Sequence, residues 1–151
     1  DVTGLLTSTP LLPGLDGRKM SKSYGNAISI SMTAEETARL IKKSKSDSER
    51  NITFDPENRP EISGLLTTAG ICTSRDPAEI AEEIGMGGAG QLKRYVTEAV
   101  NGYFAPIRER REEIAQDMGY VADVLHEGNR RAREVAAATL DEVREAMGMV
   151  Y

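Results

Sequence analysis

The chain has 151 residues, of which 39% are hydrophobic and 28% charged, a composition typical of a folded domain rather than a disordered segment. Its net charge of -5 excludes broad electrostatic adhesion to nucleic acid, so any such contact must come from local basic patches. The one cysteine excludes an internal disulfide, and no apolar run approaches the ~18 residues of a membrane span. We expect a cytoplasmic protein with no membrane partner. Because the chain begins at Asp1 rather than Met, we also expect a piece of a longer protein.

The first thirteen residues are short and apolar, and they predict a strand end over 2–6 that Pro10 limits to a sheet edge. A loop follows over 18–23, because ammonium groups are costly to bury and glycines flank the segment on both sides. Within it, two lysines and two serines surround Met20, in the order Lys19, Ser21, Lys22 and Ser23. Lysine is a compact charge on a flexible stem, so this pattern suits a polyphosphate whose charge shifts during reaction. The alternative is a solvated surface turn.

Beyond the loop, Ile-Ser alternation predicts a short strand or extended segment over 27–32, and the rest of the chain reads as helical. Thr33 and Glu36 form a capping box that opens a helix through about Lys45, with Ala34, Thr37, Ala38 and Ile41 inward. A polar loop follows over 46–60. Further helices are predicted over 62–72, 77–84, 91–104, 107–117 and 120–147.

Two glycines and one proline set the boundaries of these last helices. Pro106 is expected to interrupt the helical pattern, Gly119 to end the charged helix, and Gly128 to kink or divide the final run. The final run is expected to pack through its apolar residues Val121, Val124, Leu125, Ala132, Val135, Ala136, Leu140 and Val143. The prediction is a mainly α fold, a bundle of about six helices behind a loop-and-strand segment.

Two apparent motifs carry little functional information. Residues 85–90 match G-x-G-x-x-G, but a dinucleotide site needs a strand before the glycines and a helix precedes them here, so we predict an interhelix loop. His126 lies in a stretch that superficially resembles a nucleotide-binding H-x-G-H motif, yet the second histidine is absent, which favours a structural or surface role. With one His and one Cys72, no standard metal site can be assembled.

Three basic clusters are candidates for RNA contact. Glutamates are interleaved with two of them, so intrahelical ion pairs explain these arginines well: Arg108, Arg110, Arg111, Arg130, Arg131 and Arg133. The better candidate is the cluster with few nearby acids, formed by Arg39, Lys42, Lys43 and Lys45.

The segment Lys19–Ser23 reads KMSKS, the signature of class I aminoacyl-tRNA synthetases, and it lies between Gly14-Leu15-Asp16-Gly17-Arg18 and Gly25-Asn26. With these neighbours it resembles the tryptophanyl- and tyrosyl-tRNA synthetases. The tryptophanyl branch is favoured by Ser46-Asp47-Ser48, Phe54-Asp55-Pro56-Glu57, Leu65-Leu66, Leu92-Lys93, Pro106-Ile107-Arg108 and Arg144–Met149. The resemblance runs nearly end to end, but it covers only the C-terminal half of such an enzyme.

This resemblance implies that residues 1–32 are the C-terminal end of a class I catalytic (Rossmann) domain and that residues 33–151 are a helical tRNA anticodon-binding domain. It implies an ATP-dependent tryptophan–tRNA ligase, a homodimer when complete, that takes tryptophan, tRNA(Trp) and ATP with Mg²⁺ bound through the nucleotide. Lys22 and Lys19 would be catalytic, and Lys19, Met20, Ser21, Lys22 and Ser23 would contact ATP. The isolated chain would be inactive. The alternatives are a tyrosyl-tRNA synthetase fragment and a stand-alone helical RNA- or protein-binding module.

Overall fold

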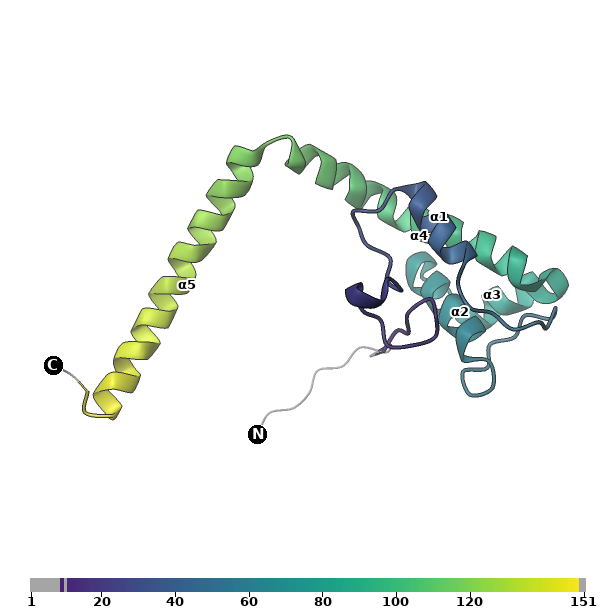
Figure 1. Ribbon diagram of the computed structural model, residues 1–151, viewed down its shortest axis with the longest axis horizontal. Helices are drawn as coiled ribbons and strands as arrows, with labels where there is room; N and C mark the ends of the chain where they lie inside the picture. The colour runs from purple at the N-terminus through teal and green to yellow at the C-terminus, as the bar shows by residue number, and fades with distance from the viewer. Residues whose placement is uncertain (1–8, 10, 150–151) are drawn as a thin grey trace. The chain divides into compact units, whose positions relative to one another are not determined.

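The computed structural model describes residue 9 and residues 11–149 (Figure 1). Its elements are the one-turn 3-10 helix η1 (Lys22–Tyr24), α1 (Ala34–Lys42), α2 (Pro60–Thr73), α3 (Pro77–Ile84), the one-turn 3-10 helix η2 (Gly85–Gly87), α4 (Gly88–Ala115) and α5 (Met118–Ala146). The described residues form no β-strand, so the fold is mainly α as predicted. The strand end predicted over 2–6 lies outside the described residues. No described helix is long and apolar enough to cross a membrane.

The described residues form two compact units, one that ends at Arg108 and one that begins at Glu109. The core of the first unit contains the buried side chains of α2 and the inward faces of α3 and α4. Its members are Ile41, Ile52, Ile62, Leu65, Leu66, Ala69, Ile80, Ala81, Ile84, Leu92, Val96 and Val100. Helix α3 therefore faces this core through three residues, and α4 faces it through the stripe at 92, 96 and 100.

Helix α1 begins where the capping box predicts. The Thr33 hydroxyl accepts a hydrogen bond from the Glu36 N–H at 3.1 Å, and the Glu36 carboxylate accepts one from the Thr33 N–H at 2.8 Å. Thr37 and Ile41 are buried as predicted, whereas Ala34 is exposed. The helix ends at Lys42 rather than Lys45, because Lys93 of α4 donates to the Lys42 and Ser44 carbonyls at 3.3 and 2.6 Å and so satisfies the helix end.

The prediction for residues 27–32 was wrong: this segment is a turn. The Met32 N–H donates to the Ser29 carbonyl at 3.0 Å, and the Ser31 N–H donates to the Ser29 hydroxyl at 3.3 Å. Serine side chains that bond to nearby backbone groups compete with strand pairing. The Ile-Ser alternation therefore has period two in sequence but forms no ladder.

Pro106 was expected to break the helix, yet it lies inside the continuous helix α4. A proline in a helix interior removes one hydrogen bond and strains the preceding turn. Here Arg108 holds the two sides together, because its guanidinium donates to Asn101 Oδ1 at 2.9 Å and to Thr37 Oγ1 of α1 at 2.8 Å. The two helices predicted over 91–104 and 107–117 are consequently one.

Helix α5 corrects two further predictions. Asp117 caps its start by accepting from the Tyr120 N–H at 2.9 Å, so Gly119 lies inside the helix, and Gly128 does not divide it. None of its described residues is buried, although the sequence predicted an inward apolar face; Leu125 is 61% exposed and Val135 69%. A stripe of apolar residues establishes that a helix is amphipathic, but not that a partner surface covers it.

Arg59 organises the connection between α1 and α2. It is only 7% exposed, and its guanidinium binds both carboxylate oxygens of Asp47 at 2.8 Å. It also donates to the Asn51 carbonyl at 2.6 Å and to Thr53 Oγ1 at 2.8 Å. The hydrogen bonds from Arg59 lower the pKa of Asp47 and those to Asp47 raise the pKa of Arg59. One side chain therefore fixes a loop that has no regular structure of its own.

We predict that Arg59→Ala lowers the free energy of unfolding by about 3 kcal/mol, because it leaves Asp47, the Asn51 carbonyl and the Thr53 hydroxyl without their donor. The matched control is Arg110→Ala, which removes an exposed arginine paired with Glu113 and should change the free energy of unfolding by less than about 1 kcal/mol. Urea denaturation followed by circular dichroism measures both. Equal losses in the two variants would contradict this assignment.

Candidate functional site

The segment from residue 13 to residue 26 closes on itself at its base. The Gly14 N–H donates to the Arg18 carbonyl at 2.8 Å, and the Leu15 N–H donates to the Asn26 carbonyl at 3.0 Å. An isolated antiparallel bridge joins Pro13 to Lys19. Gly17 has a φ of 80°, a conformation that a side chain would strain. The base is also attached to the helices, because the Lys45 N–H after α1 donates to the Leu15 carbonyl at 2.9 Å.

The sequence did not predict the structural role of Asn26 in this loop. Its side chain is buried, with 4% exposure, and it bonds to three groups of the loop. Its Oδ1 accepts from the Ser21 N–H at 2.8 Å, while its Nδ2 donates to Asp16 Oδ1 at 2.8 Å and to the Lys19 carbonyl at 3.0 Å. The only signal in the sequence is an amide directly after the closing glycine of the loop, since amides can donate and accept at once.

The predicted site residues lie along the outer part of this loop. The Ser21 hydroxyl caps η1 by accepting from the Ser23 N–H at 3.3 Å, and the two hydroxyls are 2.8 Å apart. Lys19, Lys22 and Ser23 are exposed. In the part of the chain that the structure describes, neither lysine forms an ion pair with a carboxylate. Both ammonium groups are thus exposed to solvent.

The acid of the loop is paired with a different cation. Asp16 Oδ2 lies 2.7 Å from a guanidinium nitrogen of Arg18, whose guanidinium in turn lies 5.1 Å from the ring centroid of Tyr24. The hydrogen bond from Asn26 and the backbone N–H of Arg18 lower the pKa of Asp16 to about 2. Asp16 is therefore ionised at neutral pH, and its charge offsets that of Arg18 rather than that of the lysines.

Met20 lines an apolar cavity of about 260 Å³ in the first unit. The other walls include Ile71 and Cys72 of α2 and Val100 and Phe104 of α4. Burial raises the pKa of the Cys72 thiol, in keeping with a packing rather than a nucleophilic role. Pro13, Leu15 and Met20 of the loop thus share an apolar cavity with these two helices.

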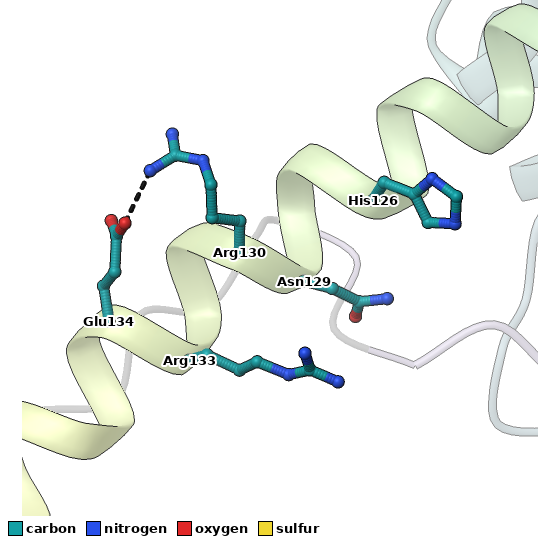
Figure 2. Close-up of a pocket in the computed structure, with 5 residues that line it drawn as sticks. All are labelled: His126, Asn129, Arg130, Arg133 and Glu134. Carbon is teal, nitrogen blue, oxygen red and sulfur yellow. Dashed lines mark hydrogen bonds and ion pairs between the residues drawn. The ribbon is translucent and has the colours of Figure 1, made fainter.

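The glycines at 85–90 follow helix α3 and not a strand, which agrees with the prediction against a dinucleotide site. They do not form the predicted loop, because residues 85–87 are the 3-10 helix η2 and α4 begins at Gly88. His126 is exposed on α5 and lines a surface pocket with Asn129, Arg130, Arg133 and Glu134. Figure 2 shows these side chains along the helix, with Arg130 and Glu134 on the side opposite Asn129 and Arg133. Arg130 points toward Glu134 there and donates to it.

Three of the six arginines follow the ion-pair prediction. Arg110 pairs with Glu113, and both Arg130 and Arg131 pair with Glu127. Arg108 joins α4 to α1 instead, and Arg111 and Arg133 form no ion pair within the described residues. In the lysine-rich cluster of α1, Lys45 pairs with Glu61, whereas Arg39, Lys42 and Lys43 are exposed.

Comparison with known proteins shows the family to which the chain belongs. Residues 2–105 match the family described as tRNA synthetases class I (W and Y). The chain belongs to this family. The matched residues include the exposed lysine–serine loop.

Individual class I synthetases are similar along nearly the whole chain. The tryptophan–tRNA ligase of Aquifex aeolicus is 38% identical over 149 residues, which cover 96% of this chain and 38% of that protein. That of Streptococcus pyogenes serotype M1 is 40% identical, over 93% of this chain and 43% of that protein. The solved tryptophanyl-tRNA synthetase of Campylobacter jejuni with ADP and tryptophan has a TM-score of 0.70 and 28% identity, covering 91% of this chain and 43% of that one. The chain spans about two-fifths of the length of these relatives.

We predict that the Asp16 carboxyl titrates near pH 2, below its ordinary pKa of 3.8. Because the folded-state pKa is lowered, the order that Asp16 gives the loop is complete above about pH 4 and is lost as the pH falls toward 2. NMR titration of the carboxyl ¹³C signal measures the midpoint. In Asn26→Ala, which removes the largest cause of the shift, the midpoint should rise. A wild-type midpoint at the ordinary value would contradict this geometry.

Proposed function

We propose that this chain is the part of a tryptophan–tRNA ligase that carries the ATP-contacting KMSKS loop and the tRNA-binding helices. One observation carries the proposal. The loop is held together by the Asn26 side chain, and its two lysines are exposed, with no described carboxylate paired with them. The names of the relatives favour tryptophan over tyrosine as the amino acid. On this proposal residues 1–32 end a Rossmann-type catalytic domain, and residues 33–151 form the anticodon-binding domain.

The loop would act in the first of two steps. The tryptophan carboxylate attacks the α-phosphate of ATP, which gives tryptophanyl-adenylate and releases pyrophosphate; the terminal adenosine of tRNA(Trp) then takes the aminoacyl group. Negative charge builds on the departing pyrophosphate, and fixed cations stabilise it most. We assign Lys22 as the main stabiliser and Lys19 as the second cation. Mg²⁺ would be held by the phosphate oxygens of the nucleotide.

The serines and Met20 would support these two cations. The Ser21 N–H is already donated to Asn26 and the Ser23 N–H to Ser21, so the hydroxyls are the serine groups we assign to phosphate contact. Met20 would hold the loop against the apolar cavity beneath it. Closure of the loop over ATP would exclude water and strengthen each contact, as loop closure does in many enzymes.

The remaining partners belong to the complete enzyme. The tryptophan pocket is assigned to residues outside this chain, so we expect the chain alone to be inactive in ATP–pyrophosphate exchange. The complete enzyme would be a cytoplasmic homodimer. For tRNA we assign the exposed basic face of α1, because its cations Arg39, Lys42 and Lys43 are exposed beside the helix end.

The test of the loop uses a chimera in which this chain replaces the aligned segment of the Aquifex aeolicus tryptophan–tRNA ligase. Lys22→Ala should lower the rate of ATP–pyrophosphate exchange about 100- to 1000-fold, because one transition-state contact is lost. The KM for tryptophan should change little. Arg144→Ala, which removes an exposed cation of α5 near Asp141, is the control and should leave the rate unchanged. An unchanged rate in Lys22→Ala would rule out the assigned role.

The test of the tRNA face uses the same chimera with Lys42 and Lys43 both changed to Ala. Each lysine that contacts a phosphate contributes to the salt dependence of binding, so the log–log salt slope should fall by about one for each contact removed. Filter binding of tRNA(Trp) between low and high salt measures the slope. Arg110→Ala removes a cation already paired with Glu113 and serves as control. The assignment fails if the slope is the same in both variants.

A further inference from the structure

Asn26 is buried beneath the loop, and its amide can adopt only one orientation. Nδ2 faces two acceptors, Asp16 Oδ1 and the Lys19 carbonyl, whereas Oδ1 faces one donor, the Ser21 N–H. A reversed amide would place oxygen against oxygen and N–H against N–H, so the surrounding groups fix which atom lies where. Two of these bonds join Asn26 to the backbone, one at Lys19 before Met20 and one at Ser21 after it.

The neighbours of Asn26 leave it no other position. Gly14 is buried against it, and a Cβ built on Gly14 would lie 2.3 Å from Asn26 Nδ2. The Asn26 carbonyl also accepts from the Leu15 N–H at 3.0 Å. Its backbone therefore closes the base of the loop while its side chain holds the middle, and the residue is only 4% exposed.

We propose that Asn26 is a positioning residue for the two phosphate-binding lysines, an inference that rests on the function proposed above. By holding the backbone on both sides of Met20, it fixes the path of the chain from which Lys19 and Lys22 extend. Asp16 orients the amide. Without these hydrogen bonds the loop would become ordered only when the ligand binds, and the entropy lost in that ordering would weaken binding.

The experiment titrates this chain with inorganic pyrophosphate and follows backbone amides by NMR. Asn26→Ala should weaken binding about tenfold, because two backbone groups of the loop lose their partners. The Ser21 amide should exchange faster with solvent, while the signals of α2 and α4 stay in place. The control is Asn58→Ala, an exposed asparagine whose amide donates to Asp55 Oδ2 at 2.8 Å in another loop, and its affinity should match that of the wild type.

A second pair of variants separates positioning from general stability. Asn26→Asp keeps the shape but sets a second carboxylate against Asp16, so binding should fall at least as far as in Asn26→Ala. Adding Asp16→Asn removes the repulsion between the two carboxylates but leaves the Lys19 carbonyl without its donor, so the affinity should recover no further than that of Asn26→Ala. Thermal unfolding of all variants shows whether affinity merely follows stability, which would overturn the inference.

The outcomes distinguish the two proposals. If the wild-type chain does not bind pyrophosphate, the role of Asn26 is overturned, whereas the proposed function is judged separately by the exchange rate of the Lys22→Ala chimera. If the wild type binds and Asn26→Ala binds equally well, the function stands and the role of Asn26 is overturned.

Discussion

A buried amide closes the lysine–serine loop, and the exposure of the two lysines follows from that closure. Asn26 satisfies the backbone groups at Lys19 and Ser21, so the loop needs no lysine side chain to hold it together. The loop's own carboxylate, Asp16, is held by the same amide and by Arg18. Charge that could have neutralised the ammonium groups is used elsewhere, and the lysines extend into solvent. The backbone of the loop is held by these hydrogen bonds, while both lysine residues are exposed.

The helices supply the support for this loop. The Lys45 N–H after α1 binds the Leu15 carbonyl, and the Lys45 side chain pairs with Glu61 at the start of α2. Arg59 in turn fixes the connection between these helices through Asp47. Since α1 is joined to α4 by Lys93 and Arg108, the base of the loop is attached to a packed core rather than to a free segment. The proposed chemistry needs such support, because a misplaced cation stabilises a departing phosphate poorly.

Local chemistry made much of the helical fold predictable from the sequence. Thr33 with Glu36 and Asp76 with Pro77 mark helix starts through bonds within three residues, and both starts are where the sequence places them. The helix break predicted at Pro106 was wrong, because the proline is tolerated through bonds of Arg108 that reach Thr37 of another helix. The strand prediction over 27–32 was wrong because serine side chains bond to nearby backbone groups there. The burial predicted for the apolar face of α5 was wrong, because periodicity contains no information about what covers a helix.

The candidate site divides in the same way. The KMSKS residues are recognisable because their composition is unusual within five positions, and their exposure follows from the cost of burying charge. Asn26 could not be assigned in advance, since its bonds reach residues five, seven and ten positions away along a folded loop. Arg59 was equally hidden, because its partners Asp47 and Thr53 come together only after the connection folds.

The central claim is that Lys22 and Lys19 meet the phosphates of ATP, and a crystal structure tests it most directly. The chimera with the Aquifex aeolicus ligase, crystallised with ATP and Mg²⁺, gives the distance from each lysine Nζ to the nearest phosphate oxygen. We predict that Lys22 Nζ lies about 2.7–3.0 Å from an oxygen of the β- or γ-phosphate. An ordered triphosphate with both ammonium groups more than about 6 Å away, beyond the reach of any hydrogen bond, would contradict the account.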